Sequence, residues 1–194
     1  MAGAPVTAMP QSAALIALLD DVVITDPAGN QARAWRFESD ADISDASQSV
    51  AGKWARTAFS PVGTAPGAHD IFSNAEGGCL ENDAPFSGPS QYYEVSVLFP
   101  AADYAKHHVA ARIKLVSGGL PEAACPAKAE LFVVAPVPPL YPMADGAAIT
   151  LNTGAWQMLN LDVPEGTVSS TSSNTVTGSP IDQLGLRITT YPCE

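Results

Sequence analysis

Apolar and polar residues alternate along four segments of this chain, residues 91–99, 107–116, 154–164 and 181–191. Side chains of a β-strand point alternately to its two faces, so this pattern predicts strands with one face on a core and the other toward solvent or a ligand. The positions predicted to be buried are Val95, Val97, Phe99, Val109, Ile113, Leu159, Leu161, Leu184, Leu186 and Ile188.

Shorter apolar segments predict further strands at residues 19–25, 34–38, 50–57, 129–135 and 147–151. Residues 60–90 are rich in Gly, Pro, Ser, Asn and Asp, which predicts a long loop. No amphipathic helix of normal length and no internal repeat is apparent. Many short strands with almost no helix predict an all-β fold, a two-sheet antiparallel β-sandwich of the jelly-roll type.

A chain of 194 residues is long enough for one domain with a full core. Residues 1–19 have the character of a leader or linker, with a short helical turn possible over residues 13–19. Residues 20–194 are predicted to form a single β-sandwich domain. The apolar run before residue 20 follows no basic segment, so it is a poor signal peptide.

The composition restricts the partners that this domain can have. Its formal net charge of -11 repels phosphate groups, so nucleic acid and anionic membranes are not expected to bind. Membrane insertion is not expected either, because no apolar run approaches the ~18 residues of a spanning helix. The acidity fits a soluble protein in a secreted or extracellular setting. Cys79, Cys125 and Cys193 are compatible with one disulfide and one spare thiol, in any pairing.

Several short motifs carry a family resemblance. An early Phe37-Glu38 pair is followed by Trp54, a central strand reads Tyr93-Glu-Val-Ser-Val97, Trp156 heads a late strand, and Leu-Gly-Leu-Arg-Ile occupies residues 184–188. In these features the chain resembles the galactose-binding-like jelly-roll modules, and among them the carbohydrate-binding modules of families 4, 9 and 22.

One feature departs from that family. Its modules close with a strand reading Ile-Asp-Asp-Val-x-Ile, which is missing after residue 188, whereas Leu19-Asp-Asp-Val-Val-Ile24 lies near the start. Residues 19–24 are an ordinary first strand, the remainder of an upstream module, or a permuted strand that fills the place of the missing last one. The permuted arrangement is compatible with chain ends that lie close together.

The resemblance implies a non-catalytic module that binds a polysaccharide or oligosaccharide. Such binding needs aromatic faces for the sugar ring and polar groups for its hydroxyls. The aromatic candidates are Tyr92 and Trp54, and the polar candidates are Arg112, Arg187 and Gln183. Each has a structural alternative, since Trp54 can belong to the core and an outward arginine is often only solvated. Trp156, at the head of a buried strand, is expected in the core.

The resemblance also implies a structural calcium ion. Calcium prefers six to eight oxygen ligands, and Glu38 and Asp21 match carboxylates of the family, with Asp40 and Asp42 nearby. The alternative is an ordinary acidic surface loop.

No catalytic motif accompanies these residues. The alternative function is a jelly-roll polysaccharide lyase acting on a uronate-containing polymer, in which Tyr92, His108, Arg112 and Arg187 would meet on a concave sheet. A third possibility is a purely structural sandwich without a small ligand.

Overall fold

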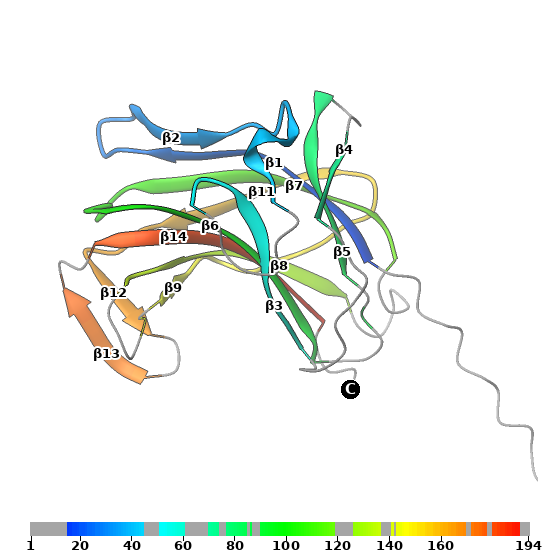
Figure 1. Ribbon diagram of the computed structural model, residues 1–194. Helices are drawn as coiled ribbons and strands as arrows, with labels where there is room; N and C mark the ends of the chain where they lie inside the picture. Colours follow the sequence, from blue (N-terminus) through cyan, green and yellow to red (C-terminus); the bar gives the residue numbers. More distant parts are fainter. Residues whose placement is uncertain are drawn as a thin grey trace, which may run out of the picture.

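The structure is a computed structural model, and it describes residues 15–44, 51–60, 70–73, 77–84, 86, 90–118, 126–136, 141, 143–169, 172–177 and 180–190. Two six-stranded antiparallel sheets pack face to face as a β-sandwich (Figure 1). The helical element that lies wholly within the described residues is η1, the 3-10 turn Asp40–Asp42. No helix in these ranges could cross a membrane. The all-β sandwich predicted from the alternation is confirmed.

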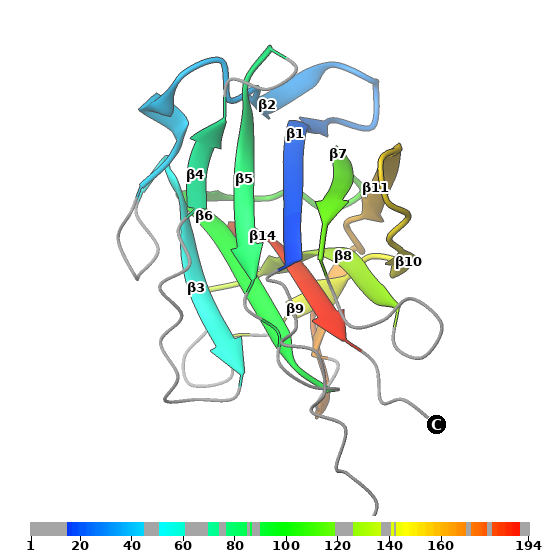
Figure 2. The ribbon, with the colours of Figure 1, turned by 90° about the vertical axis from the view of Figure 1, so that its right-hand side faces the viewer.

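The first sheet, called the β7 sheet, has the strand order β11-β7-β1-β5-β4, with β2 paired to β1 (Figure 2). Its strands are β1 (Leu15–Thr25), β2 (Gln31–Trp35), β4 (Asp70–Ser73), β5 (Cys79–Ala84), β7 (His108–Ser117) and β11 (Trp156–Asp162).

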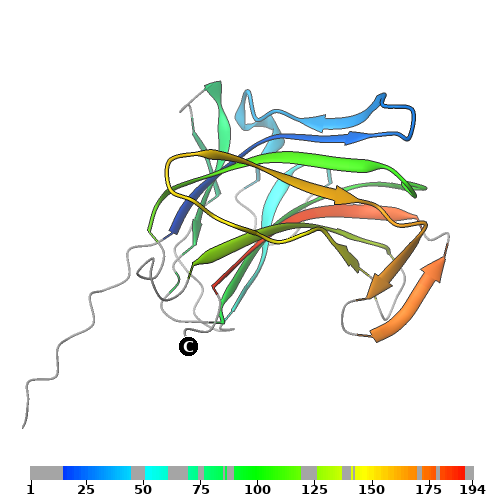
Figure 3. The ribbon, with the colours of Figure 1, turned by 180° about the vertical axis from the view of Figure 1, so that it is seen from behind.

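The second sheet, called the β14 sheet, has the order β10-β8-β14-β6-β3, with β9 paired to β8. Its strands are β3 (Trp54–Ser60), β6 (Tyr92–Ala102), β8 (Ala127–Val134), β9 (Met143–Asp145), β10 (Ile149–Thr150) and β14 (Ile181–Thr190). A hairpin of β12 (Gly166–Ser169) and β13 (Ser172–Thr177) lies beside β9 (Figure 3).

The core lies between the two sheets. All ten positions that the alternation predicted to be buried are buried, none more than 5% exposed. An aromatic group closes one part of this core, where Trp35 packs edge to face on Trp54 and Phe99 packs edge to face on Tyr104. Burial of large aromatic side chains in such contacts contributes strongly to the stability of a β-sandwich.

The first strand of the sandwich begins at Leu15, earlier than the predicted start at residue 19. Residues 15–19, predicted as part of a leader with a helical turn, are the first half of β1 and pair with both β5 and β7. Leu15, Ala17 and Leu19 lie in the core, and Leu18 on the opposite face is also buried. A strand with neighbours on both sides can be apolar on both faces, which hides the alternation that marks a strand.

The predicted long loop at residues 60–90 contains β4 and β5. In β5, Leu80 and Ala84 face the core together with Asn82, whose polar side chain conceals the apolar pattern. The Asn82 amide donates to the backbone oxygens of Ala17 and Leu80, at 3.3 Å each. These bonds satisfy the buried amide nitrogen, whereas Asn82 Oδ1 is buried without a hydrogen-bond partner among the described residues. Cys79 is buried, and Cys125 and Cys193 lie outside the described residues.

Gly185 creates the space for an aromatic ring on the outer face of the β14 sheet. Phe132 on β8 pairs with Gly185 on β14, and a Cβ atom built on Gly185 would overlap the Phe132 ring. The Phe132 side chain is 1% exposed although it lies outside the main core. The glycine therefore lets Phe132 lie flat against the sheet.

We predict that Gly185→Ala destabilises the fold by about 1–3 kcal/mol, because the added methyl group displaces the Phe132 ring from a packed position. Chemical denaturation of the wild type and the variant measures this loss. In the double variant Gly185→Ala/Phe132→Ala the alanine at 185 should cost much less than in the single variant. Equal costs in the two backgrounds would show that Phe132 does not lie over Gly185.

Candidate functional site

The sandwich distributes the candidate binding residues over two outer faces. Tyr92, Gln183 and Arg187 project from the β14 sheet, on the side opposite the core residues of β6 and β14. Arg112 projects from the opposite side of the molecule, on the outer face of the β7 sheet. The core separates the two groups, so they form two distinct polar faces.

Trp54 belongs to neither face. It is 0% exposed, and its ring packs edge to face on Trp35 and Phe37, with ring centroids 6.0 Å apart in both pairs. Its strand partner is Val97, a core position of β6, so the pairing of β3 with β6 turns the indole inward. The prediction that Trp54 is a sugar-stacking platform is therefore wrong.

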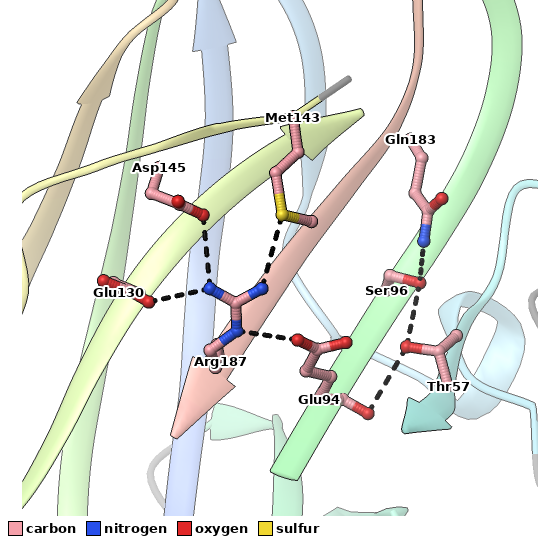
Figure 4. Close-up of polar contacts among 8 residues, drawn as sticks. All are labelled: Thr57, Glu94, Ser96, Glu130, Met143, Asp145, Gln183 and Arg187. Carbon is pink, nitrogen blue, oxygen red and sulfur yellow. Dashed lines mark hydrogen bonds and ion pairs between the residues drawn. The ribbon is translucent and has the colours of Figure 1, made fainter. Parts of the chain in front are cut away.

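Arg187 is the centre of the β14 face (Figure 4). Its Nε donates to Glu94 at 2.7 Å, and its Nη1 donates to Glu130 at 3.0 Å and to Asp145 at 3.3 Å. Its Nη2 lies 3.4 Å from the Met143 sulfur. The register explains the first two contacts, since Arg187 stands opposite Glu94 on β6 and Glu130 on β8. A ligand carboxylate at Nε or Nη1 would have to break an existing ion pair, and one at Nη2 would have to displace the Met143 sulfur.

Burial shifts the ionisation of this network. Desolvation raises the pKa of Glu130, and this outweighs the opposing effect of Arg187. Burial acts against the charged form of Arg187 too, but its hydrogen bond to Glu94 and the surrounding carboxylates raise its pKa overall. Arg187 therefore stays charged, and Glu130 accepts a proton more readily than an exposed glutamate.

Gln183 is also engaged within the β14 face (Figure 4). Its Nε2 donates to Ser96 Oγ at 2.8 Å, and Ser96 Oγ donates to Thr57 Oγ1 at 3.3 Å. Ser96 is fully buried. Tyr92, partly exposed, stands opposite Thr189 on the same face. Gln183 and Arg187 thus act mainly as internal partners within their sheet.

Trp156 lies outside the core, contrary to the sequence prediction. On β11 the core-facing positions are Leu159 and Leu161, so Trp156 shares the outward side with Met158 and Asp162. It is partly exposed and stands opposite Lys114 on β7. The alternation itself carried this information, because Trp156 is an even number of residues from Met158.

Arg112 lies beside this indole. Its guanidinium carbon is 5.0 Å from the Trp156 ring centroid, and the Lys114 amine is 5.9 Å from it. Arg112 Nη2 contacts Asp20 at 2.6 Å and Asp21 at 2.9 Å. Within the described part of the chain Nη1 has no partner. One nitrogen is thus anchored while another remains available.

A β-bulge provides the two carboxylates. The pairing of β1 with β7 shifts register between Asp20 and Val23, and Asp21 has a φ of 47°. A bulge re-aims the side chains beside it, and here both consecutive aspartates reach the same arginine. Burial raises the pKa of Asp20, against the effect of its hydrogen bonds. The bulge therefore holds Arg112 through one nearly buried aspartate, Asp20, and one partly exposed aspartate, Asp21.

The residues of the alternative lyase site are not brought together. His108 and Arg112 lie on the outer face of β7, whereas Tyr92 and Arg187 lie on the outer face of the other sheet. His108 pairs with Asp162 Oδ1 at 2.7 Å. The four residues therefore do not form one site, because the core separates the first pair from the second.

Of the two residues proposed to bind calcium, Asp21 already forms ion pairs with arginines. Asp21 contacts the guanidinium groups of Arg36 at 3.4 Å and Arg112 at 2.9 Å. Glu38 is exposed in a bend. Among the described residues no group of three or more His, Cys, Asp or Glu side chains is placed to hold a metal ion. Because a cation at Asp21 would meet two positive groups, Asp21 does not fit a calcium site in this arrangement.

Comparison with known proteins gives no family assignment, since no protein family and no curated protein matches the chain. The functional interpretation therefore depends on the geometry of the two faces.

The raised pKa of Glu130 predicts a pH-dependent stability. Protonated Glu130 stabilises the folded state relative to the unfolded state. This stabilisation is fully present when the pH is below 4.5, the ordinary pKa of a glutamate, and it is lost as the pH rises through the raised pKa of the folded state. The free energy of unfolding of the wild type, relative to Glu130→Gln, should therefore increase as the pH falls from neutral. Urea denaturation at a series of pH values measures both curves.

Asp26 provides the opposite control, because its hydrogen bonds with Asn30 lower its pKa. Relative to Asp26→Asn, the wild type should lose stability as the pH falls. A wild-type curve that runs parallel to that of Glu130→Gln would contradict the assignment of the buried carboxyl.

Chelation tests the calcium ion that the family resemblance implies. Because Asp21 is already paired with arginines, we expect EDTA to leave the melting temperature unchanged and elemental analysis to find no stoichiometric metal. An ion that binds only the folded state would instead lower the melting temperature when removed. Such a loss, restored by added calcium, would support the calcium site and contradict the ion-pair role of Asp21.

Proposed function

We propose that this domain is a non-catalytic carbohydrate-binding module that binds a polysaccharide or oligosaccharide on the outer face of the β7 sheet. The observation that carries the proposal is the outward position of Trp156 beside Arg112, whose guanidinium lies 5.0 Å from the indole centroid. An aromatic plane and an adjacent fixed donor are the two elements that sugar recognition needs. A secreted or extracellular location would accord with this function.

The apolar part of the proposed surface extends beyond the indole. Met158, two residues along β11, is 51% exposed and stands opposite Arg112. Trp156 and Met158 thus lie next to each other on the outward side of one strand. Grouped exposed apolar side chains on a polar face indicate a contact surface more strongly than a single one does. The apolar side of a pyranose ring would lie on this strip.

The polar part of the surface is held in place before a ligand arrives. Asp20 has a side chain only 7% exposed, and together with Asp21 it fixes Arg112 Nη2. An arginine that is already ordered loses less conformational entropy on binding. The free Nη1 can then donate to a sugar hydroxyl at the edge of the stacked ring.

The β14 face is a weaker candidate because its polar groups are less accessible. The Arg187 side chain is 19% exposed and paired with three carboxylates, whereas the Arg112 side chain is 39% exposed with one nitrogen available. A ligand on the β14 face would have to compete with partly buried ion pairs, and breaking such pairs is costly. A ligand on the β7 face would leave the existing ion pairs intact.

We expect Trp156→Ala to weaken glycan binding about 5- to 150-fold, because losing an aromatic binding anchor costs about 1–3 kcal/mol. Affinity electrophoresis in soluble polysaccharides, followed by calorimetry on those that bind, measures the change. Tyr141→Ala is the matched control, since Tyr141 is an exposed aromatic outside β11. Its binding should equal that of the wild type.

Tyr92→Ala separates the two faces. Binding that survives Trp156→Ala but is lost in Tyr92→Ala would move the site to the β14 face. If the unmutated protein binds no glycan, the carbohydrate-binding function itself fails.

A further inference from the structure

We infer that the ligand of the β7 face is a neutral glycan and not a uronate-containing or sulfated one. This inference rests on the proposed function and specifies its ligand class. It starts from one juxtaposition, in which Arg112 lies next to Trp156 and is paired through Nη2 with the carboxylate of Asp21.

The positive charge of Arg112 is already compensated. Two carboxylates contact its Nη2, from Asp20 at 2.6 Å and from Asp21 at 2.9 Å. Asp20 is almost completely buried, so it cannot move away to make room for a ligand anion. A ligand carboxylate or sulfate at Arg112 would therefore approach the like charge of Asp21 at close range, where repulsion is only partly screened.

A neutral sugar hydroxyl meets complementary partners at the same place. A hydroxyl group both donates and accepts hydrogen bonds. It can accept from Arg112 Nη1 and donate to the Asp21 carboxylate, whose side chain is 38% exposed. Two neighbouring hydroxyls on one ring can use the two groups together, so the ion pair serves as a combined donor and acceptor.

The remaining charges of this face do not favour an anion. Arg36, 3.4 Å from Asp21, and Lys114, near the indole, are positive. Glu81, however, stands in the same row as Lys114 across β1, since both pair with Leu18. Asp162, 92% exposed, lies at the other end of β11. The whole chain carries a net charge of -11, which repels polyanions over about 10 Å at 0.1 M salt. The charges of this face and the net charge of the whole chain therefore both disfavour an anionic ligand.

Pairs of polysaccharides that share a backbone and differ in charge test the inference. Suitable pairs are polygalacturonate with its carboxyl-reduced product, alginate with its carboxyl-reduced product, and carboxymethyl with hydroxyethyl cellulose. Calorimetry at low and at physiological salt should find that, wherever a pair binds, the neutral member binds at least tenfold more tightly. The difference should be larger at low salt, where repulsion is less screened.

Asp21→Asn tests the local origin of the preference. Removing this carboxylate should raise the affinity for the charged member relative to the neutral one, more than Asp162→Asn does. Asp162→Asn removes the same charge from the same face, away from Arg112, and so controls for net charge. Equal effects of the two variants would overturn the role of Asp21.

The outcomes separate this inference from the proposed function. Charged members that bind more tightly than neutral ones, with binding that still requires Trp156, would overturn the inference and leave the glycan-binding function intact. Failure of every member of every pair to bind, with other neutral glycans also failing, would remove the proposed function itself.

Discussion

The alternation of side chains along a pleated strand is the constraint on which the rest of this structure depends. Each long strand must turn one set of side chains into the core, and the other set is then fixed on an outer face. In β11, burial of Leu159 and Leu161 forces Trp156 and Met158 outward. In β3, pairing with the core position Val97 forces Trp54 inward. A slip of one residue would exchange these faces, so the packed core also determines which aromatic can meet a ligand.

The two outer faces use their arginines differently. Arg187 is surrounded by carboxylates and contributes to the cohesion of the β14 sheet. Arg112 is held from one side by the bulge at Asp20 and Asp21, and its other side is left beside the indole. The same pairing of arginine with carboxylate therefore produces a closed network on one face and a prepared surface on the other. The Arg112 side chain is the more exposed of the two arginines, so the face that carries it is the better binding surface.

The sequence predicted the fold and the buried positions well because alternation is a local property. It failed where the outcome depends on partners far along the chain. Residues 15–19 are apolar on both faces because β5 and β7 flank them, and the buried Asn82 donates hydrogen bonds to the backbone of β1 and β5. The contact of Arg112 with Asp20 joins residues 92 positions apart and depends on a bulge, which no spacing in the sequence reveals. The outward position of Trp156, by contrast, was readable from its parity with Met158.

The most direct test of the account follows the three indole N–H signals in a two-dimensional NMR spectrum during titration with a neutral glycan that binds. Trp35 and Trp54 are buried in the core, so their signals should stay in place, while the signal of Trp156 should shift and saturate with the binding curve. Assignment by Trp156→Phe identifies the third signal. A titration in which the Trp156 signal does not move while the protein binds the glycan would contradict the central claim, that the outward face of β11 is the binding surface.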